Sequence, residues 1–250
     1  MADTIRFRIK RQDRPDAGSY WQEFAIPAKP GHNVISALMV IRANPVTAAG
    51  ERVEPVMWES NCMEEVCGAC TMLVNGQVRQ ACSALVDDLE QPITLEPMTK
   101  FPVVRDLMVD RSAMFDALRR VRAWIDIDGS WDIHVGSPRI SPKEWEMNYI
   151  ISRCMTCGCC MEACPQYGPG LDFIGPAPIA QVRLMNGHPT GAYYAAERLH
   201  TIMGDGGLSD CGNAQNCVAV CPKEIPLTTA IGQLGRQTTV QMLRDLFGRS

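Results

Sequence analysis

The chain has 250 residues, of which 46% are hydrophobic and 21% are charged, and its formal net charge at pH 7 is −4. That length suits one large domain or two modest domains with buried cores, and the weakly negative charge gives no reason to expect a nucleic-acid partner. No stretch approaches the 18 consecutive apolar residues of a membrane-spanning helix. Residues 1–15 are charged and lack the apolar region of a secretory signal, so we expect the protein to reside in the reducing cytoplasm.

The N-terminal part of the chain begins with two predicted strands and a helix. Thr4–Lys10 alternates apolar and basic side chains, which is typical of a half-buried strand, and Trp21–Ala28 resembles its antiparallel neighbour. Val34–Ala43 has apolar residues at helical spacing, with Asn33 as the N-cap and Asn44-Pro45 as the stop.

A hairpin and a last strand complete this part. Asn75-Gly76 is the strongest short hairpin signal, and the predicted strands Thr71–Val74 and Gln77–Ala81 flank it. Ile93–Leu95 supplies another strand. Two strands, a helix and further strands within about 100 residues favour an α+β domain of the β-grasp kind.

The same part carries three cysteines with the spacing C-x4-C-x2-C, followed by a fourth. The spacing of the first three is the plant-type spacing for a 2Fe–2S cluster. The fourth follows the hairpin, which folds back to its start, so this cysteine can return to the loop. Gly68 leaves room for backbone to approach the sulfides. The predicted 2Fe–2S ligands are Cys62, Cys67, Cys70 and Cys82.

After this part the pattern becomes helical. We interpret Phe101–Asp110 as a segment that crosses between domains. Ser112 can cap a helix that has Phe115, Leu118 and Val121 on one stripe.

Further helices follow. Residues 141–144 (SPKE) form a capping box with proline at the first helical position, and the helix that they start leads to Cys154. Other helices are predicted over Ile179–Met185, over Ala192–Met203 and from Leu227 onward. The second half is therefore mostly α-helical, and we predict two domains, residues 1–108 and residues 109–250.

Two cysteine runs in the second half match another kind of cluster loop. Residues 154–165 read CMTCGCCMEACP, which with Cys159 counted as an intervening residue is C-x2-C-x2-C-x3-C-P, the run that binds a cubane cluster in bacterial-type ferredoxins. Pro165 has no N–H and a fixed φ, so it can end the loop and start a helix. In two-cluster ferredoxins the last cysteine of the run ligates the other cluster, so we assign Cys164 to a second cluster.

The second run predicts the type of that cluster. Residues 211–222 read CGNAQNCVAVCP and follow the same template, with Ala214 in place of the second cysteine. Exchange of the last cysteines gives one cluster four thiolates and the other three. A cube that lacks one thiolate tends to lose that iron, which predicts one 4Fe–4S and one 3Fe–4S cluster. The predicted 4Fe–4S ligands are Cys154, Cys157, Cys160 and Cys221, and the predicted 3Fe–4S ligands are Cys164, Cys211 and Cys217.

Zinc is the main alternative for a C-x2-C pair, and disulfides are another. A zinc site requires two such pairs with a longer spacer, or histidine partners. In a chain of 250 residues, 12 cysteines are too few for a disulfide scaffold. We interpret Cys159 as a buried thiol that ligates nothing. No Ser/His/Asp set, phosphate loop or carboxylate pair has positional support, so we predict no catalytic residue and expect the chain to move electrons.

A plant-type 2Fe–2S domain followed by a bacterial-type domain with one full and one alanine-interrupted run resembles the iron–sulfur subunit of succinate dehydrogenase and fumarate reductase. The match covers nearly the whole chain, including SNCMEEVCGAC, FPVVRDLMVD, FIGPAPIAQVRL and DCGNAQNCVAVCP. The resemblance implies a flavoprotein partner that oxidises succinate at FAD. It also implies a relay through the 2Fe–2S, 4Fe–4S and 3Fe–4S clusters to a quinone at a membrane anchor.

One departure concerns the quinone. Ubiquinone-reducing relatives carry two tryptophans shortly after the first C-P and a histidine after the first cysteine of the last run, where this chain has Gly168-Pro169 and Gly212. CMTCGCC, GPAPIAQVRL and HPTGA look more like the menaquinone-linked branch, whose anchor is a cytochrome b with haem b. The resemblance thus implies a peripheral subunit on the cytoplasmic face of the cell membrane. A quinol:fumarate reductase running in reverse and the iron–sulfur subunit of another respiratory dehydrogenase remain alternatives.

Overall fold

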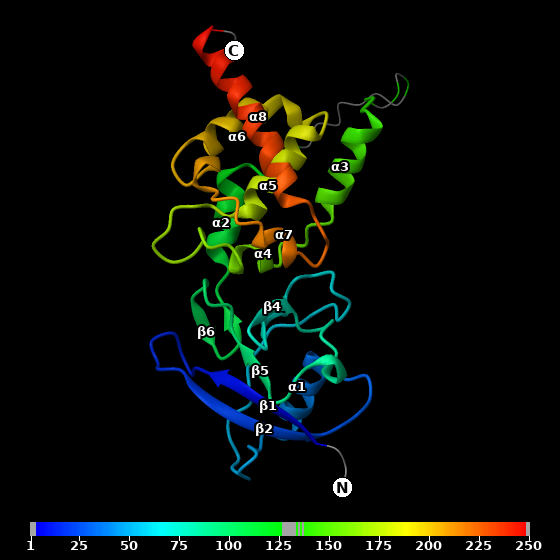
Figure 1. Cartoon of the computed structure of the whole chain (residues 1–250), viewed down its shortest axis with the longest axis vertical. Helices are drawn as coiled ribbons and strands as arrows, with labels where there is room; N and C mark the ends of the chain where they lie inside the picture. The colour runs from blue at the N-terminus through cyan, green and yellow to red at the C-terminus, as the bar shows by residue number, and fades with distance from the viewer. Residues whose placement is uncertain (1–3, 127–133, 135, 137, 249–250) are drawn as a thin grey trace. The chain divides into compact units, whose positions relative to one another are not determined.

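The computed structural model describes residues 4–126, 134, 136 and 138–248 (Figure 1). The chain divides into two compact units. The first unit comprises Met1–Arg111 and Met155–Glu162, and the second comprises Ser112–Cys154 and Ala163–Ser250. The boundary predicted between residues 108 and 109 stays a prediction, and the outer ends of the predicted domains, at residues 1 and 250, lie outside the described residues.

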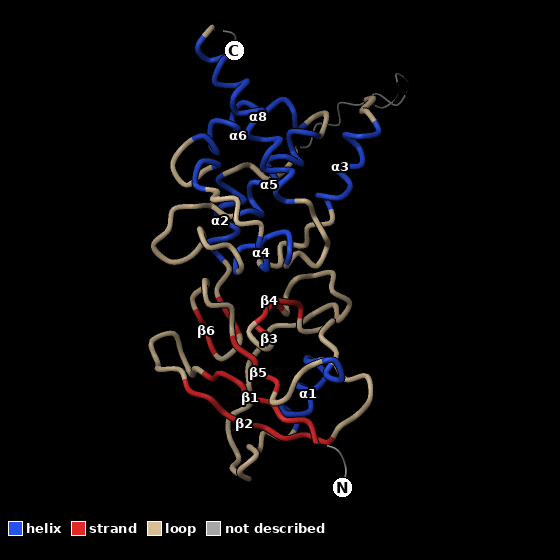
Figure 2. The backbone as a smooth tube through the Cα atoms, in the orientation of Figure 1, coloured by secondary structure: helices blue, strands red, loops and turns tan. Residues whose placement is uncertain are grey.

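The first unit is built on a mixed sheet of five strands, together with two helices and a small two-stranded hairpin. Its strands in spatial order are β2, β1, β5, β3 and β4 (Figure 2). Strands β1 and β5 run parallel, and the other neighbours run antiparallel. The elements are β1 (Thr4–Arg11), β2 (Tyr20–Pro27), α1 (Val34–Ala43), β3 (Thr71–Val74), β4 (Gln77–Gln80), the 3-10 turn η1 (Val86–Asp88), β5 (Ile93–Glu96), β6 (Val103–Arg105), β7 (Met108–Val109) and α4 (Cys159–Glu162). This mixed sheet confirms the predicted α+β class.

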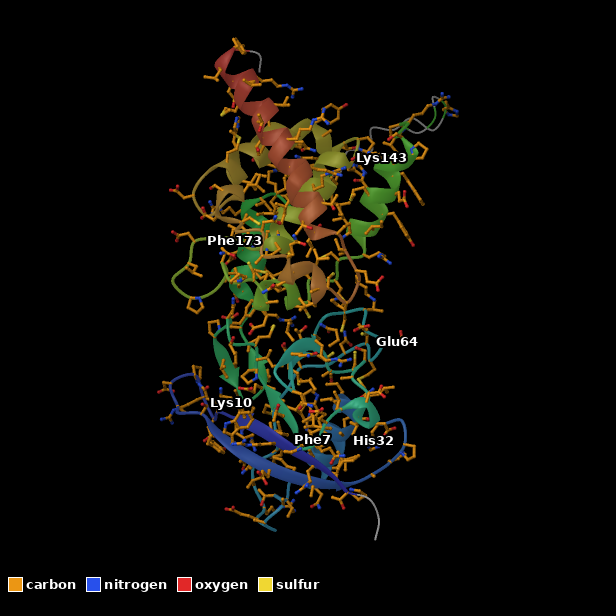
Figure 3. All side chains as sticks on the ribbon, in the orientation of Figure 1. Phe7, Lys10, His32, Glu64, Lys143 and Phe173 are labelled. Carbon is orange, nitrogen blue, oxygen red and sulfur yellow. The ribbon has the colours of Figure 1, made fainter. Side chains whose placement is uncertain are left out.

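Strand β1 has the alternation that its sequence predicts. Phe7 and Ile9 are fully buried, whereas Arg6 and Arg8 on the other face are exposed. Figure 3 labels Phe7 and, on the same strand, Lys10, whose Nζ lies 3.1 Å from a carboxylate oxygen of Glu96. Because alternate side chains of a strand point to opposite faces, β1 gives the core one apolar face, against which the buried residues of α1 pack.

Helix α1 begins and ends where the sequence predicts. The Asn33 side chain accepts a hydrogen bond from the Ser36 backbone N–H at 2.8 Å, and the Ser36 hydroxyl accepts one from the Asn33 N–H at 3.0 Å. This reciprocal capping box pairs two N–H groups that a helix start leaves without partners. The helix ends at Ala43, before Asn44-Pro45.

The prediction that Phe101–Asp110 crosses between domains is wrong, because this segment folds within the first unit. It contains the small β6–β7 hairpin. Between these strands the fully buried Asp106 carboxylate accepts hydrogen bonds from the Arg11 Nε at 2.8 Å and from the backbone N–H of Met57 at 2.9 Å. Arg11 is 1% exposed, so this buried ion pair ties the segment to β1.

The second unit is helical. Its elements are α2 (Ser112–Arg120), α3 (Pro142–Ser152), α5 (Pro176–Gly187), the 3-10 turn η2 (Gly191–Tyr194), α6 (Ala195–Met203), the 3-10 turn η3 (Leu208–Asp210), α7 (Asn216–Ala219) and α8 (Leu227–Leu246). Helix α5 is the central helix, since α2, α3, α6 and α8 all contact it. Within the described residues, no helix has both the length and the apolar character needed to span a membrane.

Two local predictions in this unit need correction. Phe115 is 47% exposed, and the fully buried Met114 lies on the inward face of α2 instead. At α3, Ser141 accepts the Glu144 N–H at 3.2 Å as predicted, but the Glu144 carboxylate turns to Arg183, with an N–O distance of 2.7 Å. Arg183 is 4% exposed, and this buried guanidinium takes the carboxylate that would have completed the capping box.

Candidate iron–sulfur centres

The loop that follows Cys62 turns backbone N–H groups toward one sulfur. The Sγ of Cys62 accepts hydrogen bonds from the N–H groups of Glu64 at 3.4 Å, Val66 at 3.3 Å and Cys67 at 3.3 Å. Met63 and Glu65 between them have positive φ, 62° and 54°, which curls the backbone around the sulfur. Such a cradle of donors suits a negatively charged thiolate.

The thiol pKa values fit a metal-ligating loop. The N–H groups of Glu64 and Val66 lower the pKa of Cys62 to about 7, which favours the thiolate that binds metals. Burial raises the pKa of Cys70 to about 12, so this sulfur stays protonated unless a positive partner compensates the cost of burying its charge. An iron ion would supply that compensation, so the lowered pKa of Cys62 supports its predicted role as a ligand and the raised pKa of Cys70 is compatible with that role.

The β3–β4 hairpin brings the fourth predicted 2Fe–2S ligand back to the loop. Asn75 and Gly76 form the turn with positive φ, 49° and 76°, as a two-residue hairpin requires. The backbone N–H of Ala81 then donates to the carbonyl of Cys70 at 3.1 Å. This bond places Cys82, the next residue, beside the strand that starts after Cys70.

The middle of the run 154–165 belongs to the first unit. Thr156 and Gly158 have positive φ, 52° and 89°, before the short helix α4 starts at Cys159. The buried Glu162 at the end of α4 accepts the backbone N–H groups of Thr99 at 2.9 Å and Lys100 at 3.1 Å. These bonds fix α4, and with it the buried Cys157 and Cys160, to the segment after β5.

Cys159 is fully buried, as its predicted role as an inert thiol requires. A hydrogen bond with Cys159, together with burial, raises the pKa of Cys157. The predictions that Cys159 binds no iron, and that Cys157 and Cys160 do, stay predictions.

In the second unit, the three cysteines assigned to the 3Fe–4S cluster share one pocket with Ala214. Burial raises the pKa of Cys217, and negative charge on Cys164 and Cys211 raises it further, which is an effect of close neighbours. The pocket is lined by Cys164, Pro165, Gln166, Phe173, Pro176, Cys211, Asn213, Ala214, Gln215, Asn216, Cys217, Thr228 and Ile231. The predicted open corner and its three thiols therefore face a common space.

Two hydrogen bonds in this unit join residues that neighbour cysteines of the two runs. The Asn216 side-chain amide donates to the carbonyl of Ala163 at 3.1 Å, which joins the residues next to Cys217 and Cys164. The Arg153 guanidinium donates to the carbonyl of Lys223 at 2.7 Å, joining the neighbourhoods of Cys154 and Cys221. The Sγ of Cys221 also accepts the N–H of Ile225 at 3.5 Å.

Zinc receives no support from this geometry. A tetrahedral zinc ion with Zn–S bonds of about 2.3 Å holds its sulfurs about 3.8 Å apart. In the described part of the chain, no three His, Cys, Asp or Glu side chains gather as they would around one ion. The spacing of the cysteines along the chain therefore remains the reason to disfavour zinc.

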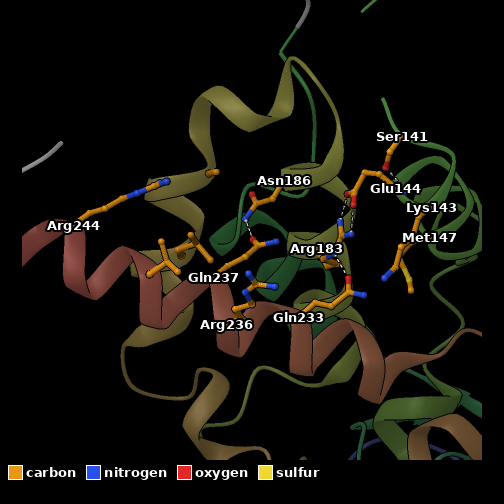
Figure 4. Close-up of a pocket in the computed structure, with 13 residues that line it drawn as sticks. Ser141, Lys143, Glu144, Met147, Arg183, Asn186, Gln233, Arg236, Gln237 and Arg244 are labelled. Atoms are coloured by element: carbon orange, nitrogen blue, oxygen red, sulfur yellow. Dashed lines mark hydrogen bonds and ion pairs between the residues drawn. The ribbon is translucent and has the colours of Figure 1, made fainter. Parts of the chain in front are cut away.

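A larger pocket of about 600 Å³ lies among α3, α5, α6 and α8 of the second unit, without a lining cysteine (Figure 4). Several of its polar side chains bond to one another. Arg183 donates to Gln233 at 2.6 Å and pairs with Glu144, and the Asn186 amide donates to Gln237 at 3.2 Å. These bonds crosslink α3, α5 and α8, which assigns those side chains to helix packing.

Spacing arguments missed Gln80 and Thr71. Both are buried polar residues that contact the cysteine loops. Gln80 ends a strand and Thr71 begins one, and a residue's position in a hairpin does not reveal which loop will cover it. No signal in this single sequence could have identified them.

Comparison with known proteins finds two iron–sulfur domains in this chain. Residues 6–116 match the family described as 2Fe-2S iron-sulfur cluster binding domain, and residues 150–225 match the 4Fe-4S dicluster domain. A solved structure, described as the Mycobacterium smegmatis Sdh1 complex in the apo form, includes a similar chain. It has a TM-score of 0.77 and 19% identity, over 96% of this chain and 98% of that chain, which shows the fold alone.

Relatives matched over nearly their full length establish the family of this chain. The chain is 30% identical to the fumarate reductase iron-sulfur subunit of Wolinella succinogenes over 95% of this chain and 98% of that protein. It is 58% identical to the succinate dehydrogenase iron-sulfur subunit of Bacillus subtilis, over 98% of this chain and 96% of that protein. The chain therefore belongs to the family of succinate dehydrogenase and fumarate reductase iron–sulfur subunits, and its role is electron transfer through a 2Fe–2S domain and a 4Fe–4S domain.

Proposed function

We propose that this chain is the electron-transfer subunit of a succinate:quinone oxidoreductase, between an FAD-containing flavoprotein and a cytochrome b anchor with haem b. Its three predicted clusters, 2Fe–2S, 4Fe–4S and 3Fe–4S, supply one-electron carriers when bound. Their proposed ligands are the eleven cysteines assigned above from spacing. The acceptor is menaquinone, and the subunit is peripheral on the cytoplasmic face of the membrane.

One observation carries the proposal: Cys164, Cys211 and Cys217 line one pocket together with Ala214. A fourth cysteine at position 214 would complete a cubane site, whereas alanine has no donor atom. Three thiolates and an open corner support a 3Fe–4S cluster as the last carrier. The 58% identity to a protein named succinate dehydrogenase iron-sulfur subunit supports the reaction.

The chain's own residues hold the sulfurs and their charge. Backbone N–H groups around Cys62 stabilise its thiolate, and the buried Glu162 fixes the helix that carries Cys160. The Asn216 and Arg153 hydrogen bonds fasten the two cysteine runs of the second unit. Sulfurs that the chain holds in place need little rearrangement when the charge of a cluster changes.

The choice of menaquinone rests on a missing side chain. At Gly212, where ubiquinone-linked relatives have histidine, an added Cβ would lie 2.7 Å from the Gln166 Nε2. The flexible end of Gln166 can turn away from such a Cβ, so what argues against the ubiquinone pocket is the glycine itself, which has no imidazole.

A quinol:fumarate reductase is the second candidate, because relatives with 30% identity bear that name. Both candidates use the same clusters. Rates of succinate oxidation and of fumarate reduction by the assembled complex, measured with menaquinone analogues, decide the direction.

Low-temperature EPR on anaerobically purified protein, with iron counted alongside, tests the proposal. We expect about nine irons (two, four and three). We also expect a 3Fe–4S signal in the oxidised sample that disappears with dithionite, joined by a reduced 2Fe–2S signal. A silent oxidised sample with about ten irons would contradict the assignment at Ala214, and a colourless protein containing zinc would contradict the function.

A further inference from the structure

The side-chain amide of Gln80, at the end of β4, is fully buried between two predicted cluster loops of the first unit. Its Nε2 lies 2.6 Å from the Thr71 hydroxyl and 3.4 Å from the Sγ of Cys159. Its Oε1 lies 3.5 Å from the Sγ of Cys70. One amide thus contacts a predicted 2Fe–2S ligand and the neighbour of Cys160.

Thr71 decides which way this amide faces. Its hydroxyl lies 2.9 Å from the carbonyl of Cys157 and 3.0 Å from the carbonyl of Gly68, and both carbonyls can only accept. The hydroxyl therefore donates its single proton to these carbonyls, so its oxygen must accept a hydrogen bond from the Gln80 side chain. That contact requires the nitrogen of the amide, which leaves the oxygen facing Cys70.

The same two loops also touch through their backbones. A Cβ built on Gly68 would lie 2.7 Å from the Cα of Cys157, so this contact admits only glycine without a shift. Gly68, Thr71 and Gln80 therefore join the loop of Cys67 and Cys70 to residues 157–159 within one unit.

We propose that Gln80 is a positioning residue that ties the loop of Cys70 to residues 157–159 and lowers the midpoint potential of the 2Fe–2S cluster. The proposal rests on the ligand assignment under the proposed function. An iron-bound thiolate at Cys70 has no proton to donate, so the Gln80 oxygen faces the sulfur with its partial negative charge. Reduction adds negative charge to the cluster, and a nearby negative dipole opposes it.

The test compares Gln80→Leu with Gln77→Leu in the full chain. Gln77 is the first residue of the same strand and is exposed, so the control makes the same chemical change without removing a buried amide. The readout is a redox titration in which EPR follows the reduced 2Fe–2S signal. We expect an upward shift of the midpoint potential in Gln80→Leu and the wild-type value in Gln77→Leu.

A second variant covers the case in which Gln80→Leu fails to assemble its cluster. Thr71→Val keeps the shape of the side chain but removes the hydroxyl, so the amide can turn its N–H toward Cys70. A hydrogen bond to the sulfur favours the reduced state, so we again expect an upward shift.

An unchanged or lowered potential in an assembled variant overturns the proposal. A wild-type sample without any reduced 2Fe–2S signal would instead refute the proposed function and this inference with it. The two failures are therefore distinguishable.

Discussion

Replacing Gly68 with alanine tests whether the two cysteine loops of the first unit are in direct backbone contact. Gly68 has φ of +72°, and an added Cβ would lie 2.7 Å from the Cα of Cys157 and 2.9 Å from the carbonyl oxygen of Met155. Both neighbours are backbone atoms, so no side-chain rotation can relieve the clash. The substitution must either separate the loops or strain them.

The expected cost has two parts. A left-handed conformation costs a residue with a Cβ about 1–2 kcal/mol, and overpacking a tight contact costs about 1–3 kcal/mol. Gly76→Ala is the matched control, because Gly76 has φ of +76° with no atom within 4 Å of an added Cβ. The control incurs only the cost of the left-handed conformation, so the two variants should differ in stability by about 1–3 kcal/mol. That difference measures the cost of overpacking the contact between the loops.

The assay is the loss of the 2Fe–2S absorption on heating, at one scan rate for all samples because cluster loss is irreversible. In a protein of this size each kcal/mol lowers the midpoint by about 2–4 °C. We therefore expect Gly68→Ala to lose its cluster about 2–12 °C below Gly76→Ala. Equal midpoints for the two variants would refute the contact between Gly68 and Cys157.

Two further substitutions address the cysteine assignments. Ala214→Cys places a fourth thiol in the pocket of Cys164, Cys211 and Cys217, so we expect the iron count to rise by about one and the oxidised 3Fe–4S EPR signal to be replaced by that of a 4Fe–4S cluster. An unchanged 3Fe–4S signal would show that position 214 is not the open corner. Cys159→Ser keeps a hydrogen-bond acceptor for Gln80, so we expect all three clusters to remain by EPR and iron analysis. Loss of the 4Fe–4S cluster would mean that Cys159 is a ligand.

The accuracy of the sequence predictions depended on how far each signal reached along the chain. The cap of α1 at Asn33 and the turn at Asn75-Gly76 form as predicted, since their partners lie within a few residues. The pairing of β1 and β2 is antiparallel as predicted. Such features follow from local hydrogen bonds and side-chain periodicity.

The errors share a different origin. Phe115 and Met114 are both apolar, and only the packing of α2 determines which one is buried. The Glu144 carboxylate has a local partner in the capping box, but the buried Arg183 from α5 binds it instead. In Phe101–Asp110, the buried pair with Arg11 holds the segment inside the first unit.

By itself, the sequence determined the family and predicted the cluster types and their ligands, because cluster loops need fixed spacings between thiolates and glycine or proline at defined turns. Only the tertiary structure decided that Gln80 lies between Cys70 and Cys159, and that Gly68 packs on Cys157. The contacts of Gln80 with Cys159 and of Gly68 with Cys157 join residues about 80 to 90 positions apart in the chain. Side-chain periodicity and local spacing carry no information over that separation, which is bridged only when the sheet, the hairpin and α4 pack into one core.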